Sequence, residues 1–130
     1  MSGFLNPIRA EDLPDGYHRK LLEDVVYHVG SPSSKDRIVV PAGFIWDGGS
    51  VPRIFWELVD PWGSASKAYL LHDWLYHTQE RSRLVSDAIL MEAMEVLGVG
   101  FIKRKVIYRA VRMFGGIAWK NNANKSSAQK

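Results

Sequence analysis

Three apolar stretches of helix length follow one another in the second half of the chain, and they constrain the fold most. Each repeats apolar residues at helical spacing, and serines that can cap a helix precede the first two. Paired glycines follow the second stretch, as is common where helices end. The sequence predicts helices from Ser64 or Ser66 to about His77, from Ser82 or Ser86 to near Gly98, and from Ile102 to Trp119.

The third predicted helix has an apolar stripe and a basic face. The basic face is either solvated or directed at phosphate groups of lipids or nucleic acid. Its basic residues are Lys103, Arg104, Lys105, Arg109 and Arg112. The apolar stripe consists of Ile102, Val106, Ala110, Met113 and Ile117.

The first half of the chain has the pattern of strands and turns. Residues 21–29 and 37–40 are rich in β-branched and aromatic side chains, and a turn-forming segment separates them. A β-hairpin is therefore expected. Residues 47–53 follow as a structured loop, because two glycines permit positive φ and Pro52 restricts the residue before it. The chain is predicted to be α+β, with an N-terminal β-hairpin region packed on about three C-terminal helices.

Chain length and composition limit the number of domains and the kinds of site that the chain can form. A chain of 130 residues suits one domain, expected over residues 1–120, and the polar residues 121–130 are expected to form a disordered tail. The absence of cysteine excludes disulfides and thiolate metal sites. The N-terminus lacks the apolar core of a signal peptide, and no run reaches the length of a membrane span.

The first predicted helix carries a concentrated group of reactive side chains. His72, Asp73 and Tyr76 lie within about two turns, and the four-residue spacing places His72 and Tyr76 on one face. Leu71 and Leu75 form the adjoining apolar stripe, so His72 is expected at the edge of the buried face.

Asp87 on the second predicted helix needs a partner. Leu90, Met91 and Met94 follow it at helical spacing, so its carboxylate points along an apolar stripe, where an unpaired charge is costly. Residues 78–81 can join two antiparallel helices and bring Asp87 to His72. A carboxylate on one ring nitrogen fixes the tautomer and leaves the other nitrogen free to take a proton from water.

Two interpretations of this pair remain open. It can activate water, or it can satisfy itself and fix the register of two helices. An opening from the second His72 nitrogen into a pocket favours catalysis, and a sealed pair favours bracing. The loop Asp47-Gly48-Gly49-Ser50 is likewise either a tight turn or a source of oxygen ligands for a hard cation such as calcium.

Several ordered motifs over roughly residues 20–120 resemble a family of small uncharacterised proteins encoded largely by bacteriophages and prophages. The resemblance implies a phage context, in the host cytoplasm or the virion, and no particular activity. Its motifs are Val40-Pro41-Ala42-Gly43-Phe44, Asp47-Gly48-Gly49-Ser50-Val51-Pro52-Arg53, His72-Asp73-Trp74-Leu75-Tyr76, Arg83 and Asp87.

The motif His72-Asp73-x-x-Tyr76 is also similar to the catalytic helix of phospholipase A2. This resemblance implies that His72 is the base, Asp73 a calcium ligand, Tyr76 a support and Asp87 the orienting carboxylate. The glycine-rich calcium loop of those enzymes is absent, and only Asp47, Gly48 and Gly49 could replace it.

Two functions follow as hypotheses. The first is a hydrolase resembling phospholipase A2, dependent on calcium and meeting a phospholipid surface through its basic last helix. The second is a non-enzymatic phage morphogenesis or virion protein, with a phage structural protein as its partner and a purely structural polar cluster. Nucleic-acid binding ranks a distant third.

Overall fold

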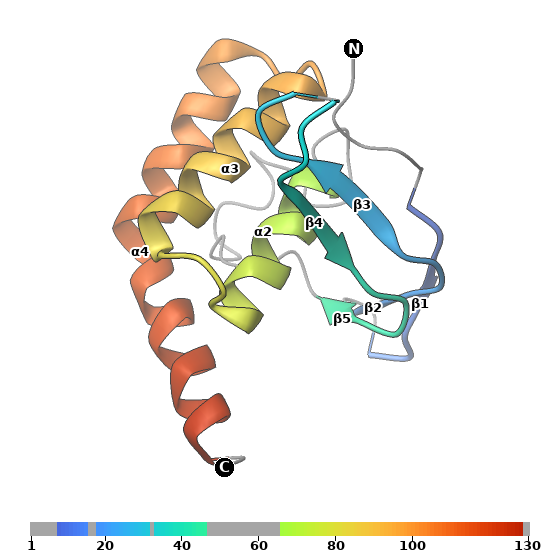
Figure 1. Cartoon of the computed structure of the whole chain (residues 1–130). Helices are drawn as coiled ribbons and strands as arrows, with labels where there is room; N and C mark the ends of the chain where they lie inside the picture. The colour runs from blue at the N-terminus through green and yellow to red at the C-terminus, as the bar shows by residue number, and fades with distance from the viewer. Residues whose placement is uncertain (1–7, 16–17, 32, 47–65, 129–130) are drawn as a thin grey trace.

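A computed structural model describes residues 8–15, 18–31, 33–46 and 66–128 of the chain. Strands precede helices, and the strands lie on one side of the helical layer (Figure 1). The predicted α+β class, with strands first and three helices after them, is confirmed. The elements are β1 (Ala10–Asp12), β2 (Arg19–Leu21), β3 (Val25–His28), β4 (Arg37–Val40), β5 (Ile45–Trp46), α2 (Ser66–Thr78), α3 (Arg83–Val96) and α4 (Phe101–Ala128).

The predicted hairpin is formed by β3 and β4. They pair antiparallel from Val25 opposite Val40 to His28 opposite Arg37. Alternate side chains of both strands are buried, as expected for a ribbon with one face on the core. Tyr27 is one of these buried residues, and its hydroxyl donates a 2.5 Å hydrogen bond to Glu92 of α3. The hairpin is thereby attached to the helices.

The sequence predicts one continuous strand over residues 21–29, and this prediction is wrong. Leu21 belongs to β2, which pairs antiparallel with both β1 and β5 in a separate sheet. The chain bends after Leu21, where Leu22 N–H donates to Arg9 O and Asp24 accepts from Ala42 N–H. These hydrogen bonds do not belong to either strand pairing. They divide the extended segment into two strands that lie in two different sheets.

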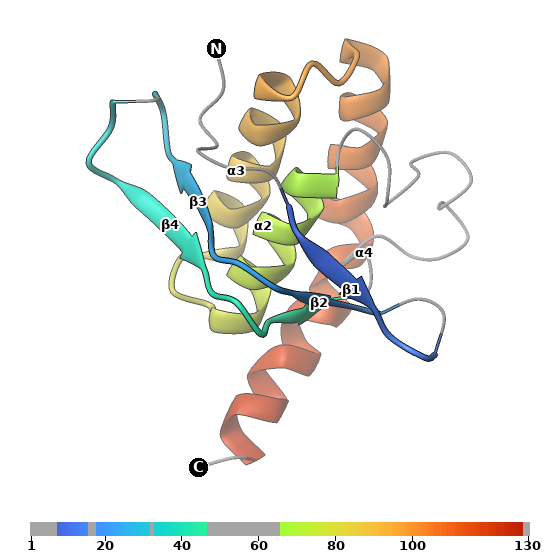
Figure 2. The ribbon, with the colours of Figure 1, turned by 90° about the vertical axis from the view of Figure 1, so that its right-hand side faces the viewer.

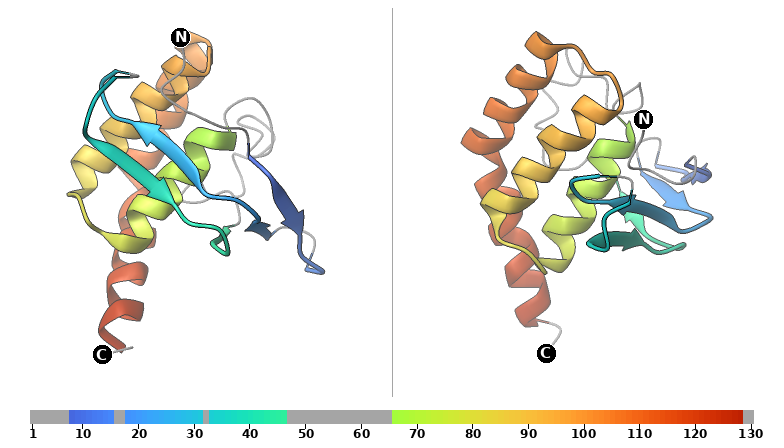
Figure 3. Two further views of the ribbon diagram at one scale, coloured as in Figure 1. Left: turned by 45° about the vertical axis from the view of Figure 1, so that its right-hand side comes forward. Right: turned by 45° about the horizontal axis from the view of Figure 1, so that its top comes forward.

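The two ends of α3 follow from local chemistry. Ser82 caps α3, and its side chain accepts a hydrogen bond from Val85 N–H. Gly98 ends this segment with φ +79°, which glycine adopts without strain, as the sequence predicted. The short connection between α2 and α3 makes them antiparallel neighbours (Figure 3).

The last helix extends beyond its predicted end. Residues 121–128, expected to form a disordered tail, continue α4 to Ala128. The turns near Trp119 still have tertiary partners, because Gln79 of the α2–α3 connection donates to Trp119 O. Asn122 also donates within the helix to Ala118 O. The end of α4 projects past the other elements (Figures 1 and 2).

Most of the apolar stripe predicted for the last helix does not face the core, and Ala110 is its one buried member. The fully buried residues of α4 are Ile107 and Val111, which lie outside the predicted stripe. Ile102, Met113 and Ile117 of the stripe are exposed. None of the helices within the described residues is long and apolar enough to cross a membrane. The core joins strands and helices through Tyr27, Ile38, Val40, Trp46, Leu70, Leu71, Leu75, Leu90, Met94, Ile107 and Val111.

Candidate functional site

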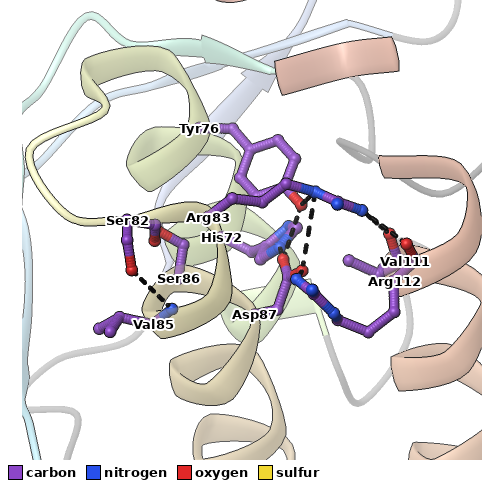
Figure 4. Close-up of polar contacts among 9 residues, drawn as sticks. All are labelled: His72, Tyr76, Ser82, Arg83, Val85, Ser86, Asp87, Val111 and Arg112. Atoms are coloured by element: carbon purple, nitrogen blue, oxygen red, sulfur yellow. Dashed lines mark hydrogen bonds and ion pairs between the residues drawn. The ribbon is translucent and has the colours of Figure 1, made fainter. Parts of the chain in front are cut away.

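His72 and Asp87 meet between α2 and α3, as the sequence predicted (Figure 4). His72 Nε2 lies 2.7 Å from Asp87 Oδ1. The residues are only 2% and 0% exposed, respectively. The antiparallel arrangement of the two helices therefore places the ring and the carboxylate together inside the protein.

Asp87 is the centre of a larger cluster that joins three helices. Its Oδ1 also accepts a 2.6 Å hydrogen bond from the Tyr76 hydroxyl, and its Oδ2 accepts a 2.7 Å bond from Arg112 Nη1 of α4. Arg83 Nε lies 4.0 Å from Oδ2. A buried carboxylate is tolerated here because several donors replace the water that it loses. We call His72, Tyr76, Arg83, Asp87 and Arg112 the Asp87 cluster.

Arg83 connects the Asp87 cluster to the backbone of α4. Its Nε donates to the Tyr76 hydroxyl at 3.2 Å. Its Nη2 donates to the carbonyl oxygens of Val111 and Arg112 at 3.0 and 2.7 Å. One guanidinium thus spans all three helices, which uses the rigid, forked geometry of arginine.

Two neighbouring glycines of α4 lie against the Asp87 cluster, and Gly115 makes the closer approach. A Cβ added at Gly115 would lie 2.7 Å from the Tyr76 hydroxyl, which the surrounding hydrogen bonds hold in place. At Gly116 the nearest atom would be Arg83 Cζ at 3.7 Å, an ordinary contact. A methyl group therefore fits at position 116 but overlaps the Tyr76 hydroxyl at position 115.

Alanine at these two glycines should change stability in opposite directions. Gly116→Ala is expected to raise the free energy of unfolding by about 0.5–1 kcal/mol, the usual helical gain over glycine. Gly115→Ala is expected to lower it by about 1–3 kcal/mol through overpacking against Tyr76. Urea unfolding of both variants tests this, and a gain of stability at Gly115 would contradict the described contact.

Burial and hydrogen bonding set the protonation states in the Asp87 cluster. Burial lowers the pKa of His72 and outweighs the opposing effect of Asp87. Burial alone would raise the pKa of Asp87, but hydrogen bonds from His72, Tyr76 and Arg112 outweigh it and lower that pKa. The carboxylate is therefore charged and the imidazole neutral. Because a charged carboxylate can only accept a hydrogen bond, the ring proton is on Nε2 and forms the hydrogen bond to Asp87. The lone pair of the ring is then on Nδ1.

These shifts predict that stability falls on acidification. The folded pKa of His72 lies below its ordinary value of 6.5, so the unfolded chain takes up the proton first as the pH falls. The contribution of His72 to the free energy of unfolding is lost from about pH 6.5 downward. The contribution of Asp87 is lost only below its ordinary pKa of 3.8. Urea unfolding from pH 8 to pH 5 should show a steeper loss for the wild type than for His72→Gln. Parallel curves would contradict the assignment.

A pocket of about 610 Å³ lies on a neighbouring face of α2. Asp73 and His77 are four residues apart on this helix and both line it. Its described walls mix aromatic and polar side chains, as ligand pockets commonly do. The lining residues are His18, Gly43, Phe44, Ile45, Trp46, Asp73, His77, Ala118, Asn121 and Asn122.

A known protein family matches residues 19–111, most of the chain, under the description "Protein of unknown function (DUF1353)". The chain belongs to the DUF1353 family. It is also 33% identical over 78 residues to an "Uncharacterized protein y4jT" of Sinorhizobium fredii (strain NBRC 101917 / NGR234). That match covers 58% of this chain and only 23% of the relative, so the chain spans less than a quarter of the relative's length. No solved structure matches the chain.

The DUF1353 match contains the centre of the Asp87 cluster and ends just before Arg112. Neither the family description nor the name of the relative mentions a phage, a lipid or an enzymatic activity. The phage context thus remains a prediction for this DUF1353 protein.

The predicted site residues of this DUF1353 chain are divided between two faces of α2. His72 and Tyr76 join Asp87 on the side of α3, while the predicted metal ligand Asp73 lines the pocket. Residues 47–49, the predicted cation loop Asp47, Gly48 and Gly49, lie outside the described residues. Within the described residues, no group of three or more His, Asp or Glu side chains could hold a metal ion.

The sequence interpretation of this DUF1353 chain missed the roles of the two arginines. Arg83 lies four residues before Asp87, a spacing that signals a helical ion pair. Arg112 was grouped with a basic face directed at solvent or phosphate, and that was wrong for this residue, because it bonds to Asp87. Its role depends on how α4 packs, which no local spacing reports.

Proposed function

We propose that this DUF1353 protein is a hydrolase of carboxylic esters, resembling phospholipase A2, in which His72 and Asp87 activate a water molecule. The supporting observation is the bond from His72 Nε2 to a buried carboxylate that Tyr76 also binds. The resemblance assigns the base, the orienting carboxylate and the support to these three residues, and their mutual contact supports the proposal.

The chemistry follows from the protonation states. Neutral His72 accepts a proton from water at Nδ1, and the resulting hydroxide attacks the ester carbonyl carbon. Asp87 stabilises the imidazolium that forms. The imidazolium then returns the proton to the leaving alkoxide as the acyl–oxygen bond breaks, giving a fatty acid and a lysophospholipid. The proton that His72 takes from water therefore ends on the oxygen of the leaving group.

The described residues supply only part of a calcium site. Calcium takes six to eight oxygen ligands, and Asp73 is the one carboxylate that lines the pocket among these residues. Calcium dependence therefore remains a prediction, and no step above passes through the metal.

Hydrolysis of phospholipid vesicles tests the proposal. Fatty acid release from ester-linked phosphatidylglycerol is measured with calcium or with a chelator, and ether-linked lipid serves as the unreactive control. Asp73→Asn is expected to lower the rate by about tenfold or more, because it removes the carboxylate of the pocket while leaving the Asp87 cluster in place. Release no faster than the buffer background by the folded wild type would reject the hydrolase.

A non-enzymatic phage morphogenesis or virion protein is the second candidate, and the sealing of the Asp87 cluster favours it. His72 and Asp87 are buried, and the described lining of the pocket does not include His72. Arg112 and Arg83 also offset part of the charge that Asp87 would use to stabilise an imidazolium. This candidate predicts that variants of the cluster lose stability, that no hydrolysis is detected, and that the protein copurifies with virions or an assembly intermediate.

A further inference from the structure

The outward side of α4 carries an apolar stripe without a described partner in the fold. Ile102, Met113 and Ile117 are 77%, 74% and 69% exposed, and Val106 is also exposed. At the α-helical rotation per residue, these four side chains fall within an arc of roughly 60°. Large exposed apolar side chains gathered in one stripe mark an interaction surface more often than scattered ones do. We call these four residues the α4 stripe.

Cations flank the α4 stripe, and α4 itself contains no acidic residue that could offset them. Residues 101–128 contain seven Lys and Arg residues and no Asp or Glu. By helical geometry, Lys105 and Arg109 follow one edge of the stripe and Lys103 the other. Across the described part of the chain, no salt bridge engages these three residues. The partner of this face should therefore be both apolar and anionic.

From this pattern we infer that the α4 stripe docks on an anionic lipid surface, with α4 lying in the plane of the headgroups. The inference deepens the phospholipid partner expected for the hydrolase, but it uses none of the Asp87 cluster and holds whether or not the protein hydrolyses lipid. An interfacial helix of this kind buries its apolar stripe at the acyl boundary while Lys and Arg meet the phosphates.

The shape and charge of α4 favour lipid over other partners. The helix forms an outer edge of the fold (Figure 1), and its 28 residues span about 42 Å, which suits contact with an extended surface. A two-fold pairing of the α4 stripe with a second copy would bring the two Arg109 side chains together near its centre, which like charges disfavour. Nucleic acid would neutralise the cations but would leave Ile102, Met113 and Ile117 exposed.

Vesicle binding by the full chain tests the inference. Vesicles of ether-linked phosphatidylcholine, with and without ether-linked phosphatidylglycerol, exclude ester hydrolysis, so failure of the proposed enzyme leaves this result intact. We expect at least about tenfold stronger partitioning onto the anionic vesicles, weakened by salt. The double variant Met113→Glu/Ile117→Glu should lose at least about tenfold in binding. Leu22→Glu, an exposed substitution between β2 and β3, should bind like the wild type.

Circular dichroism verifies that each variant is folded. Equal binding to neutral and anionic vesicles, or equal binding of the double variant and the wild type, would overturn the inference. So would the absence of binding to either vesicle. A dimer in light scattering that the double variant dissociates would assign the stripe to a second copy of the chain instead.

Discussion

Replacing Asp87 with alanine is expected to lower the free energy of unfolding by about 3–5 kcal/mol. The change removes the common acceptor of His72, Tyr76 and Arg112. His72 and Tyr76 are buried and cannot exchange this acceptor for bulk water. Arg112 is about one-third exposed in its side chain and can turn toward solvent, so its share of the loss is smaller.

Two further variants make this prediction specific. Asp87→Asn keeps the shape and one acceptor oxygen but loses the charge, and we expect a loss of about 2 kcal/mol. It keeps the test decisive if the alanine variant does not fold. Glu95→Ala removes an exposed carboxylate from the same helix and should change stability by less than about 0.5 kcal/mol. Urea unfolding measures all three, and values for both Asp87 variants within about 1 kcal/mol of the wild type would contradict the described cluster.

The helices and the His72–Asp87 contact were predictable because their signals are local. Ser82 and Gly98 mark the ends of α3, and the periodic apolar residues identify the helix between them. The contact followed from one physical rule. A carboxylate on an apolar stripe needs a donor, and the short connection to α2 offered His72 as the candidate.

The packing of α4 was not predictable from its own sequence. Ile107 and Val111 form one apolar row on this helix, and the α4 stripe forms another. Periodicity alone cannot say which row enters the core, since both have helical spacing. The close approach at Gly115 and the bond from Arg112 to Asp87 settle the choice, and both depend on tertiary structure.

The pocket also depends on tertiary structure. Its described walls combine His18 and Phe44 from the strand region with Asp73 from α2 and Asn121 from α4. These residues are far apart in the sequence, and no local spacing predicts that they meet. The sequence motifs include Phe44 and Asp73, but only Asp73 is assigned a chemical role, through the resemblance to phospholipase A2.

His72→Gln is expected to reduce ester hydrolysis by about 10²–10⁴-fold, the usual contribution of a general base. Glutamine can still direct an N–H group toward Asp87, but its amide cannot accept a proton at neutral pH. The variant therefore separates the two interpretations of the Asp87 cluster. A structural brace predicts a modest loss of stability without any loss of activity, since it assigns no activity to His72.

The most direct measurement is the rate of fatty acid release from ester-linked phosphatidylglycerol vesicles by folded wild type and folded His72→Gln, assayed with calcium at neutral pH. A wild-type rate well above the buffer background, reduced at least about a hundredfold in the variant, is the result that the water-activating pair predicts. Equal rates for the two proteins, at background or above it, would contradict it and assign His72 and Asp87 to the structural brace.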